Sequence, residues 1–238
     1  MQKNINNPKE QDQSLYRWIG SFSSNKKTTV IELIGLPGSG KSTLANTICL
    51  WHIKNVIVFS DTKCLKGKEG GLNNKIVSSL LRVYRRILFS THRLKLLIQN
   101  NKAFIYYKIL INNSPIPRKV KKARLRMWLS GSRFYSKKNN TSLKKILIHD
   151  EGLIYRAMSL SQSDVNLIDV DKYLDLLPKP DALIYIYSSE NVIKKRLNKR
   201  EYKTVNHVKL MHKSEMAFKR IKSKYDNVES FDYYSDIG

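Results

Sequence analysis

The segment from Ile31 to Ile48, IELIGLPGSGKSTLANTI, combines a glycine-rich loop with a lysine and a serine. Its spacing, Gly-x-x-x-x-Gly-Lys-Ser, is that of a P-loop, and it follows a short apolar run that predicts a strand. Glycines permit a tight turn in which successive N–H groups face one hollow and bind phosphate oxygens. The residues expected to bind nucleotide are Gly35, Pro37, Gly38, Ser39, Gly40, Lys41, Ser42 and Thr43.

Lys41 and Ser42 have separate roles in this motif. The helix expected to begin near Lys41 would direct its positive N-terminal end at the phosphates. Lys41 would reach the β- and γ-phosphates of ATP, and the Ser42 hydroxyl would take one Mg²⁺ position. GTPases, ATPases and kinases share this loop, so the motif predicts nucleotide binding without selecting the reaction.

Two carboxylates, Asp150 and Glu151, directly follow the apolar run ILIH at 146–149, which predicts a buried strand. Ligands gather at the carboxyl ends of parallel strands, so this pair is expected beside the P-loop. There Asp150 would either bind Mg²⁺ or take a proton from the attacking group. The alternative is that the Asp150-Glu151 pair has a structural role and caps a helix that follows the strand. Asp61, at the end of the run NVIVFSD, is expected at the same edge, where it would hydrogen-bond an acceptor hydroxyl.

The order of the predicted elements sets the fold class. Further apolar runs, ALIYIY at 182–187 and ESFDYYSD at 229–236, predict a fourth and a fifth strand, and helical patterns lie between the strands. Strands that alternate with helices predict a three-layer α/β fold of the P-loop NTP hydrolase and kinase type. We expect a parallel sheet of about five strands flanked by helices, with an enlarged basic helical insertion at 72–145.

Two arginines lie four positions apart in ENVIKKRLNKRE, residues 190–201. On a helix Arg196 and Arg200 share one face and would converge on a single phosphate group. Their charge would stabilise a γ-phosphoryl group in transfer, a role worth about 10³ to 10⁵ in rate for comparable arginines. An exposed basic helix is the alternative, because three lysines lie in the same segment.

The segment PKPDALIYIYSSENVIKKRLNKRE at 178–201, the P-loop and the strand before Asp150 resemble the nucleoside and nucleotide kinases, the thymidylate kinase-like group of P-loop kinases. In that group Pro-Asp opens the fourth strand and Arg-x-x-x-Arg lies on the following lid helix. The resemblance implies an ATP- and Mg²⁺-dependent phosphotransferase. Its implied catalytic residues are Lys41, Asp150, Glu151, Arg196 and Arg200, with Mg²⁺ held by Ser42 and Asp150.

The chain departs from thymidylate kinases at two places. They carry an Asp-Arg pair after the third strand, where this chain has Asp150 and Glu151, and their Arg-Glu-Pro-Gly loop is replaced by SDTKCLKGKEGG at 60–71. Thymidine monophosphate is therefore not indicated as the acceptor. Arg156, one helical turn beyond Glu151, is expected either to bind an anionic group of the acceptor or to form a salt bridge at the edge of the core.

Other nucleotide-dependent reactions fit the sequence less well. A GTPase would need Asn-Lys-x-Asp and a switch Asp-x-x-Gly, and neither occurs. An ATPase stays open as an alternative, because ILIHDE resembles the strand-end Asp-Glu pair of motor and transporter ATPases. In those proteins the Glu polarises a water. The stretch LSGSR at 129–133 lacks the second glycine of a transporter signature.

The formal charge of +25 is distributed unevenly. No Asp or Glu occurs from Gly70 to His149, a stretch that carries nineteen Lys and Arg. Such a field attracts polyanions, whether nucleic acid, an acidic membrane leaflet or an anionic glycan, and a solvated basic face is the alternative. Aromatic residues among these cations, including Tyr107, Trp128 and Tyr135, would either stack on bases or sugars or belong to the core.

These observations favour an ATP-dependent kinase that acts on a nucleoside, nucleotide or sugar. The alternative is a nucleic-acid-binding protein with ATPase or polynucleotide 5′-end kinase activity. We expect a polar, loose segment at 1–28 with a docking turn near Leu15 and Ile19, and a P-loop kinase domain at 29–238 with its lid at 190–203. No apolar run reaches the roughly 18 residues of a membrane span, and the expected location is the cytoplasm, with a peripheral membrane position as a variant.

Overall fold

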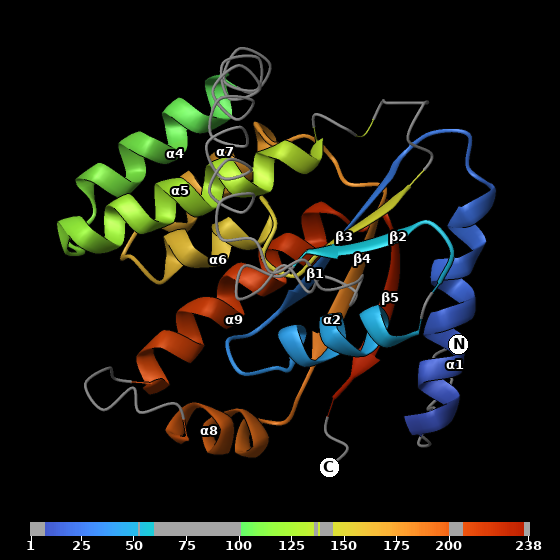
Figure 1. Ribbon diagram of the computed structural model, residues 1–238. Coiled ribbons are helices and arrows are strands. Elements are labelled where there is room, and N and C mark those ends of the chain that lie inside the picture. Colours follow the sequence, from blue (N-terminus) through green and yellow to red (C-terminus); the bar gives the residue numbers. More distant parts are fainter. Residues whose placement is uncertain are drawn as a thin grey trace, which may run out of the picture.

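Five parallel strands form the centre of the structure, a computed structural model that describes residues 8–51, 53–59, 101–135, 138, 145–199 and 207–235 (Figure 1). The strands are β1 (Thr29–Gly35), β2 (Val56–Phe59), β3 (Ile146–His149), β4 (Ala182–Tyr187) and β5 (Glu229–Tyr234), in the order β2-β3-β1-β4-β5. The Ile, Leu and Val side chains of β1 to β4 suit a parallel sheet that is covered on both faces. The expected α/β class with five parallel strands is confirmed.

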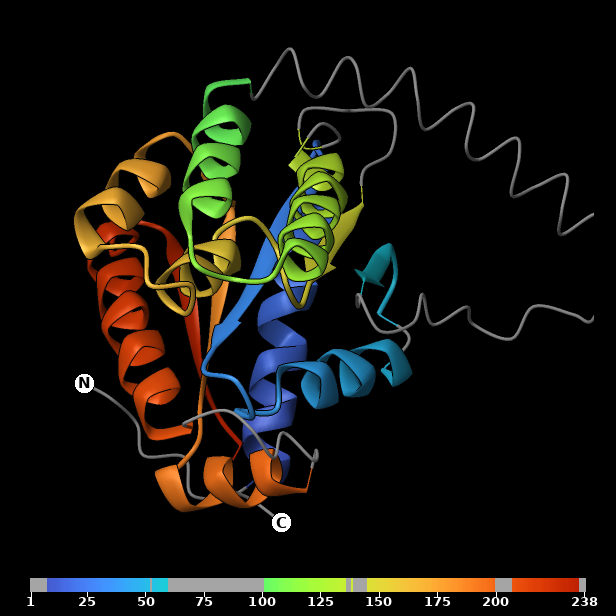
Figure 2. The same ribbon diagram turned by 90° about the vertical axis from the view of Figure 1, so that its left-hand side faces the viewer.

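Helices cover both faces of this sheet, and α2 and α9 lie on opposite sides of the strands (Figure 2). One face packs against α1 (Pro8–Ser21), the short helix η1 (Phe22–Ser24) and α2 (Lys41–Leu50). The other face packs against α4 (Asn101–Asn113), α5 (Arg118–Tyr135), α6 (Tyr155–Ser161), α7 (Leu167–Asp175) and α9 (His207–Lys224). Among the described residues, no helix is both long enough and apolar enough to cross a bilayer.

The N-terminal segment differs from the expected loose chain. Residues 8–21 form helix α1, in which Leu15 and Ile19 are fully buried against the sheet. These two residues are four positions apart and so share one face of the helix. Burial of that face holds α1 on the sheet although most of its residues are polar. Tyr233 of β5 adds a hydrogen bond from its hydroxyl to Asp12, at 3.0 Å.

Helices α4 and α5 belong to the basic insertion and are separated at 114–117, where Pro115 and Pro117 lie. Their aromatic residues belong to the core, which settles the alternative between stacking and packing for Tyr107, Trp128 and Tyr135. The Trp128 indole N–H donates to the hydroxyl of Tyr173 at 2.9 Å. The aromatic side chains of α5 thus join the helix to the core, while Arg118, Lys119, Lys122 and Arg126 are exposed.

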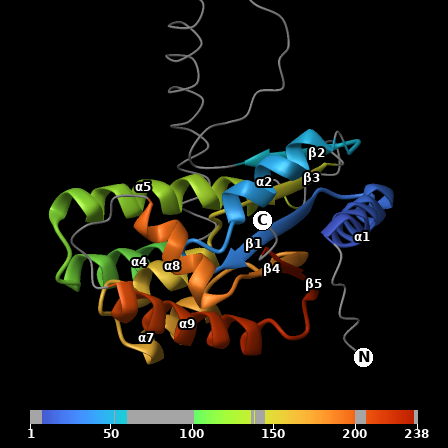
Figure 3. The same ribbon diagram turned by 90° about the horizontal axis from the view of Figure 1, so that it is seen from below.

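Helix α8 (Glu190–Asn198) follows β4 and lies at the carboxyl end of the sheet, close to the loop between β1 and α2 (Figure 3). Helix α8 covers the first part of the segment 190–203 that the sequence analysis expects to be the lid. The sheet order places β1 between β3 and β4, so the segments that follow these three strands meet at one edge.

Candidate functional site

The P-loop joins β1 to α2, and α2 begins at Lys41 as the motif predicts. Gly38 and Gly40 have φ angles of +83° and +101°, which residues with a Cβ rarely adopt. Gly35 is required for another reason. A Cβ on Gly35 would lie 2.5 Å from Oγ of Ser39 and 2.7 Å from the carbonyl oxygen of Ile186, so close packing against β4 excludes any side chain there.

Lys41 is buried beneath the loop, with only 7% of its surface exposed. Its ammonium group donates to the carbonyl oxygens of Gly35, at 2.8 Å, and Leu36, at 3.1 Å. It also lies 4.5 Å from the centre of the Tyr155 ring, at the start of α6. The positive charge is thus held at the inner side of the loop by partners from β1, the loop and α6.

The other predicted loop residues lie as the motif requires. Ser39 is buried, Pro37 is half-buried, and Thr43 is exposed in the first turn of α2. Ser42 lies in the same turn and faces the end of β3, which brings it to Asp150. Two oxygen-bearing side chains from different elements therefore meet at the mouth of the loop.

Ser42 donates a hydrogen bond from its hydroxyl to Oδ2 of Asp150, at 3.3 Å. Asp150 follows β3 directly and is 1% exposed, so the predicted convergence of the third strand with the P-loop is present. Mg²⁺ prefers oxygen ligands at about 2.1 Å in octahedral positions, in which neighbouring ligand atoms are about 3 Å apart. The Ser42 and Asp150 oxygens have both the chemistry and the spacing that fit this ion.

Glu151 and Arg156 form an ion pair beside Asp150. Arg156 Nη2 lies 3.3 Å from Oε2 of Glu151 and donates to the Glu151 carbonyl oxygen at 2.6 Å. Arg156 is also 1% exposed. Of the two roles expected for it, binding an anionic group of the acceptor or forming a salt bridge at the edge of the core, the structure has the salt bridge. His149 is also buried, and burial, with the nearby charge of Arg156, lowers the pKa of its imidazole to about 3. His149 is therefore neutral at pH 7, and its Nδ1 accepts from the Glu151 backbone N–H at 3.2 Å.

Arg196 reaches from α8 to the outer side of the P-loop. Its Nη1 donates to the carbonyl oxygen of Gly38 at 3.2 Å and to the Ser235 hydroxyl at 3.1 Å, and its Nη2 donates to the Ser235 carbonyl oxygen at 3.0 Å. The Ser235 hydroxyl in turn donates to the carbonyl oxygen of Ser39. Arg196 thus connects the loop, α8 and the end of β5. Arg200 and Asp61, the remaining predicted site residues, lie outside the described residues.

One carboxylate at this site was not predicted from the sequence. Glu32 lies in the middle of β1, is fully buried, and accepts hydrogen bonds from the turn that follows Asp150 and Glu151. Burial raises the pKa of this carboxyl above its usual range, against the opposing effect of its hydrogen bonds. The sequence did contain a sign of this role, since Glu32 is an acidic residue inside an otherwise apolar run that predicts a buried strand. Acidic residues are almost never fully buried without partners.

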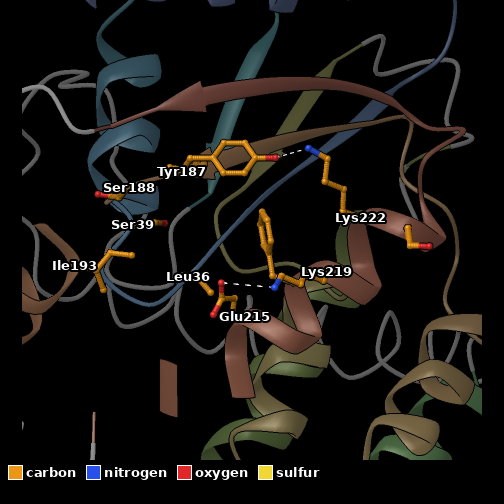
Figure 4. A pocket seen from close by; sticks show the side chains of 11 residues that line it. Leu36, Ser39, Tyr187, Ser188, Ile193, Glu215, Lys219 and Lys222 are labelled. Carbon is orange, nitrogen blue, oxygen red and sulfur yellow. Dashed lines mark hydrogen bonds and ion pairs between the residues drawn. The ribbon is translucent and has the colours of Figure 1, made fainter. Parts of the chain in front are cut away.

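A cavity of about 460 Å³ lies beside the P-loop, between the end of β4, α8 and α9 (Figure 4). Leu36 and Ser39 of the loop line one side, and Phe218 lines the side formed by α9. Tyr187 and Phe218 meet edge to face with ring centres 5.6 Å apart. Lys219, Lys222 and Glu215 also line the cavity, and Lys219 is paired with Glu215 at 3.9 Å. The cavity therefore offers aromatic surface and charged side chains next to the P-loop, in the size range of small-molecule sites.

No protein-family model matches the chain, and no curated protein matches it either. Solved structures with a similar course of the chain include a deoxyadenosine kinase from M. mycoides with the products dCMP and dCDP bound. It is 17% identical, with 86% of this chain and 89% of that chain covered and a TM-score of 0.48. A structure of deoxyadenosine kinase from M. mycoides with bound dATP is 18% identical, with 87% and 91% covered and a TM-score of 0.45.

A thymidylate kinase from Ehrlichia chaffeensis is 15% identical, with 89% of each chain covered and a TM-score of 0.39. By their names these proteins are kinases of nucleosides or nucleotides, the group that the sequence motifs resemble. At such identities the likeness concerns the fold.

Proposed function

We propose that the protein is a P-loop kinase that transfers the γ-phosphoryl group of ATP to a small-molecule acceptor, namely a nucleoside, a nucleotide or a sugar. The observation that carries the proposal is the meeting of three segments that are remote in sequence. Asp150 lies 3.3 Å from Ser42 of the P-loop, and Arg196 lies 3.2 Å from the carbonyl oxygen of Gly38 in the same loop. An acid and an arginine that both contact one P-loop are the groups that phosphoryl transfer needs.

In the proposed reaction the acceptor's hydroxyl oxygen bonds to the γ-phosphorus, the bond to the β-phosphate oxygen breaks, and ADP leaves. Asp150 takes the hydroxyl proton or, with Ser42, holds Mg²⁺. The ion, when bound, would neutralise phosphate charge. Lys41 and Arg196 stabilise the charge that spreads over the phosphoryl oxygens during transfer.

The cavity of Figure 4 is the proposed acceptor site. Tyr187 and Phe218 would pack against a base or sugar ring, and an anionic group would replace Glu215 as the ion-pair partner of Lys219, which lies 3.9 Å from Glu215. Replacing Phe218 by Ala should raise the KM for the acceptor while leaving the affinity for ATP unchanged, because only the cavity wall on α9 is altered. Equal KM values in both proteins would place the acceptor elsewhere.

The test is a screen of nucleosides, nucleoside monophosphates and sugars with ATP labelled at the γ-phosphate. We expect label on one acceptor class, lost in Lys41→Ala and retained in the matched control Lys54→Ala, whose side chain is exposed. Release of inorganic phosphate alone with every acceptor would favour an ATPase instead. No binding of ATP would remove the P-loop from the mechanism.

A second candidate follows from the outer surface of α5, where Arg118, Lys119, Lys122 and Arg126 are exposed. This basic surface suits a polyanion, which keeps a nucleic-acid-binding ATPase or 5′-end kinase as the alternative. Polynucleotide binding that falls steeply between about 50 and 200 mM salt, with turnover stimulated by the polynucleotide, would favour this alternative. Turnover that is independent of nucleic acid would favour the small-molecule kinase.

A further inference from the structure

Glu32 occupies a position in β1 where the fold otherwise places apolar side chains. Side chains alternate along a strand, and the two neighbours of Glu32 on the same face, Val30 and Ile34, both lie in the core under the helices. Glu32 is 0% exposed. Removing a carboxyl group from water costs several kcal/mol unless other groups donate hydrogen bonds to it, so its partners account for its presence.

The partners of Glu32 come from two segments remote from β1. Oε1 accepts from the Leu153 backbone N–H at 2.8 Å and from the Tyr135 hydroxyl at 2.7 Å, and Oε2 accepts from the Ile154 backbone N–H at 3.0 Å. Leu153 and Ile154 belong to the turn between Asp150 and α6. Tyr135 is the last residue of α5. One carboxyl group therefore joins the central strand to this turn and to the basic helix.

The turn fits closely around this carboxyl group. A Cβ on Gly152 would lie 2.1 Å from the carboxyl carbon of Glu32 and 2.3 and 2.4 Å from its two oxygens. Those atoms are the far end of a fully buried side chain and are held there by three hydrogen bonds. Gly152 thus lets the backbone after Asp150 and Glu151 approach Glu32 closely.

The same turn is held from its other side as well. The hydroxyl of Tyr173 donates to the carbonyl oxygen of Leu153 at 2.9 Å, and Arg156 donates to the carbonyl oxygen of Glu151 at 2.6 Å. Glu32 supplies the hydrogen bonds on the side of the turn that faces β1, the strand that leads into the P-loop. The carboxyl group thus connects the loop-bearing strand to the residues directly after Asp150.

We propose that Glu32 is a positioning residue: it fixes the turn at 150–154 so that the Asp150 carboxylate stays beside Ser42, and through Tyr135 it ties the end of α5 to that turn. This inference rests on the proposed function, because it assigns to Asp150 a role in phosphoryl transfer. Misplacement of a reacting group by about 1 Å can cost about 10²-fold in rate. Loss of the Glu32 bonds should therefore lower kcat far more than it alters ATP binding, because Glu32 lies in β1 before the P-loop.

Glu32→Gln tests the proposal because it keeps the size of the side chain but turns an amide donor toward backbone and hydroxyl donors. Tyr135→Phe removes one of the three donors and leaves the carboxyl group in place. The matched control is Tyr185→Phe, since the Tyr185 hydroxyl is buried and makes no hydrogen bond within the described part of the chain. For each protein we would measure kcat, the dissociation constant for ATP, and exchange of the Leu153 and Ile154 amide hydrogens by NMR.

We expect Glu32→Gln to lose about 10²-fold in kcat with an unchanged dissociation constant, Tyr135→Phe to lose less, and Tyr185→Phe to match wild type. The Leu153 and Ile154 amides should exchange faster in Glu32→Gln than in wild type. A folded Glu32→Gln protein with wild-type kcat, or with both amides still protected, would overturn the proposal. If Glu32→Gln does not fold, Tyr135→Phe decides, and wild-type kcat in that variant counts against the role. A wild-type protein without phosphotransfer would refute the proposed function, whereas the amide exchange would still report on the turn.

Discussion

The hydroxyl of Ser42 and the carboxylate of Asp150 lie 3.3 Å apart, although 108 positions separate them in the sequence. The first belongs to the turn that opens α2 and the second follows β3. Because β1 and β3 are neighbours in register, with Ile31 beside Ile148, the segments that leave them are brought to the same edge. This pair is the structural centre of the candidate site.

Asp150→Asn should lower phosphoryl transfer by about 10² to 10⁴, because an amide neither accepts the acceptor's proton nor binds a cation as strongly. The side-chain size is preserved, so the melting temperature should change little. Single-turnover kinetics with labelled ATP would measure the effect. Asp226→Asn, at an exposed position beyond α9, is the control and should retain wild-type rates. Near-normal transfer by the Asp150 variant would exclude both proposed roles of this carboxylate.

Arg196→Lys should lower kcat although the charge is retained. The planar guanidinium donates from two nitrogens to Gly38 and Ser235 at once, and an ammonium group lacks this fork. Lys195→Ala, on the exposed side of the same helix, serves as the control for a lost charge on α8. Steady-state kinetics should show the larger loss in Arg196→Lys. The opposite order would indicate that α8 acts only through its general positive charge.

Gly35→Ala should weaken ATP binding and destabilise the protein, since its new methyl group would lie 2.5 Å from Ser39 Oγ and 2.7 Å from a β4 carbonyl oxygen. Gly20→Ala provides a matched comparison. No atom lies within 4 Å of that Cβ position, and Gly20 is within α1. The second substitution should stabilise the protein by about 0.5–1 kcal/mol. Thermal unfolding and ATP titration of both variants measure these changes, and equal effects would contradict the close packing of Gly35.

The buried Glu32 predicts a pH dependence of stability. Burial raises its pKa in the folded protein above the usual 4.5 of a glutamate, so the folded state keeps this proton at a pH where the unfolded chain has lost it. The free energy of unfolding therefore contains a favourable contribution at low pH, and this contribution is lost as the pH rises through the folded-state pKa. Glu32→Gln does not titrate at this position. Urea unfolding of both proteins from about pH 4 to pH 8 should show wild type losing stability relative to Glu32→Gln as pH rises. Parallel curves would contradict the raised pKa.

Motifs and elements could be predicted from the sequence where the residues that define them are neighbours in the chain. The P-loop, the strand before Asp150 and the helical spacing of α8 each depend on a few neighbouring residues, and each was predicted at its place. The fully buried pair of Leu15 and Ile19 was predicted only as a docking turn. A polar composition hides a helix whose stability comes from one apolar face against a distant sheet.

The sequence by itself predicted the P-loop and the strand-end carboxylates as candidates for phosphate chemistry and that parallel strands would bring them to one edge, because motif spacing and strand periodicity are local properties of the chain. Only the tertiary structure decided which partner each residue meets: Arg156 pairs with Glu151, the aromatic residues of the basic insertion enter the core, and Glu32 holds the turn after Asp150. These pairings depend on burial and on contacts between distant segments, and in the case of Glu32 the partners are more than 100 positions away. No short stretch of sequence encodes either the burial or the contacts.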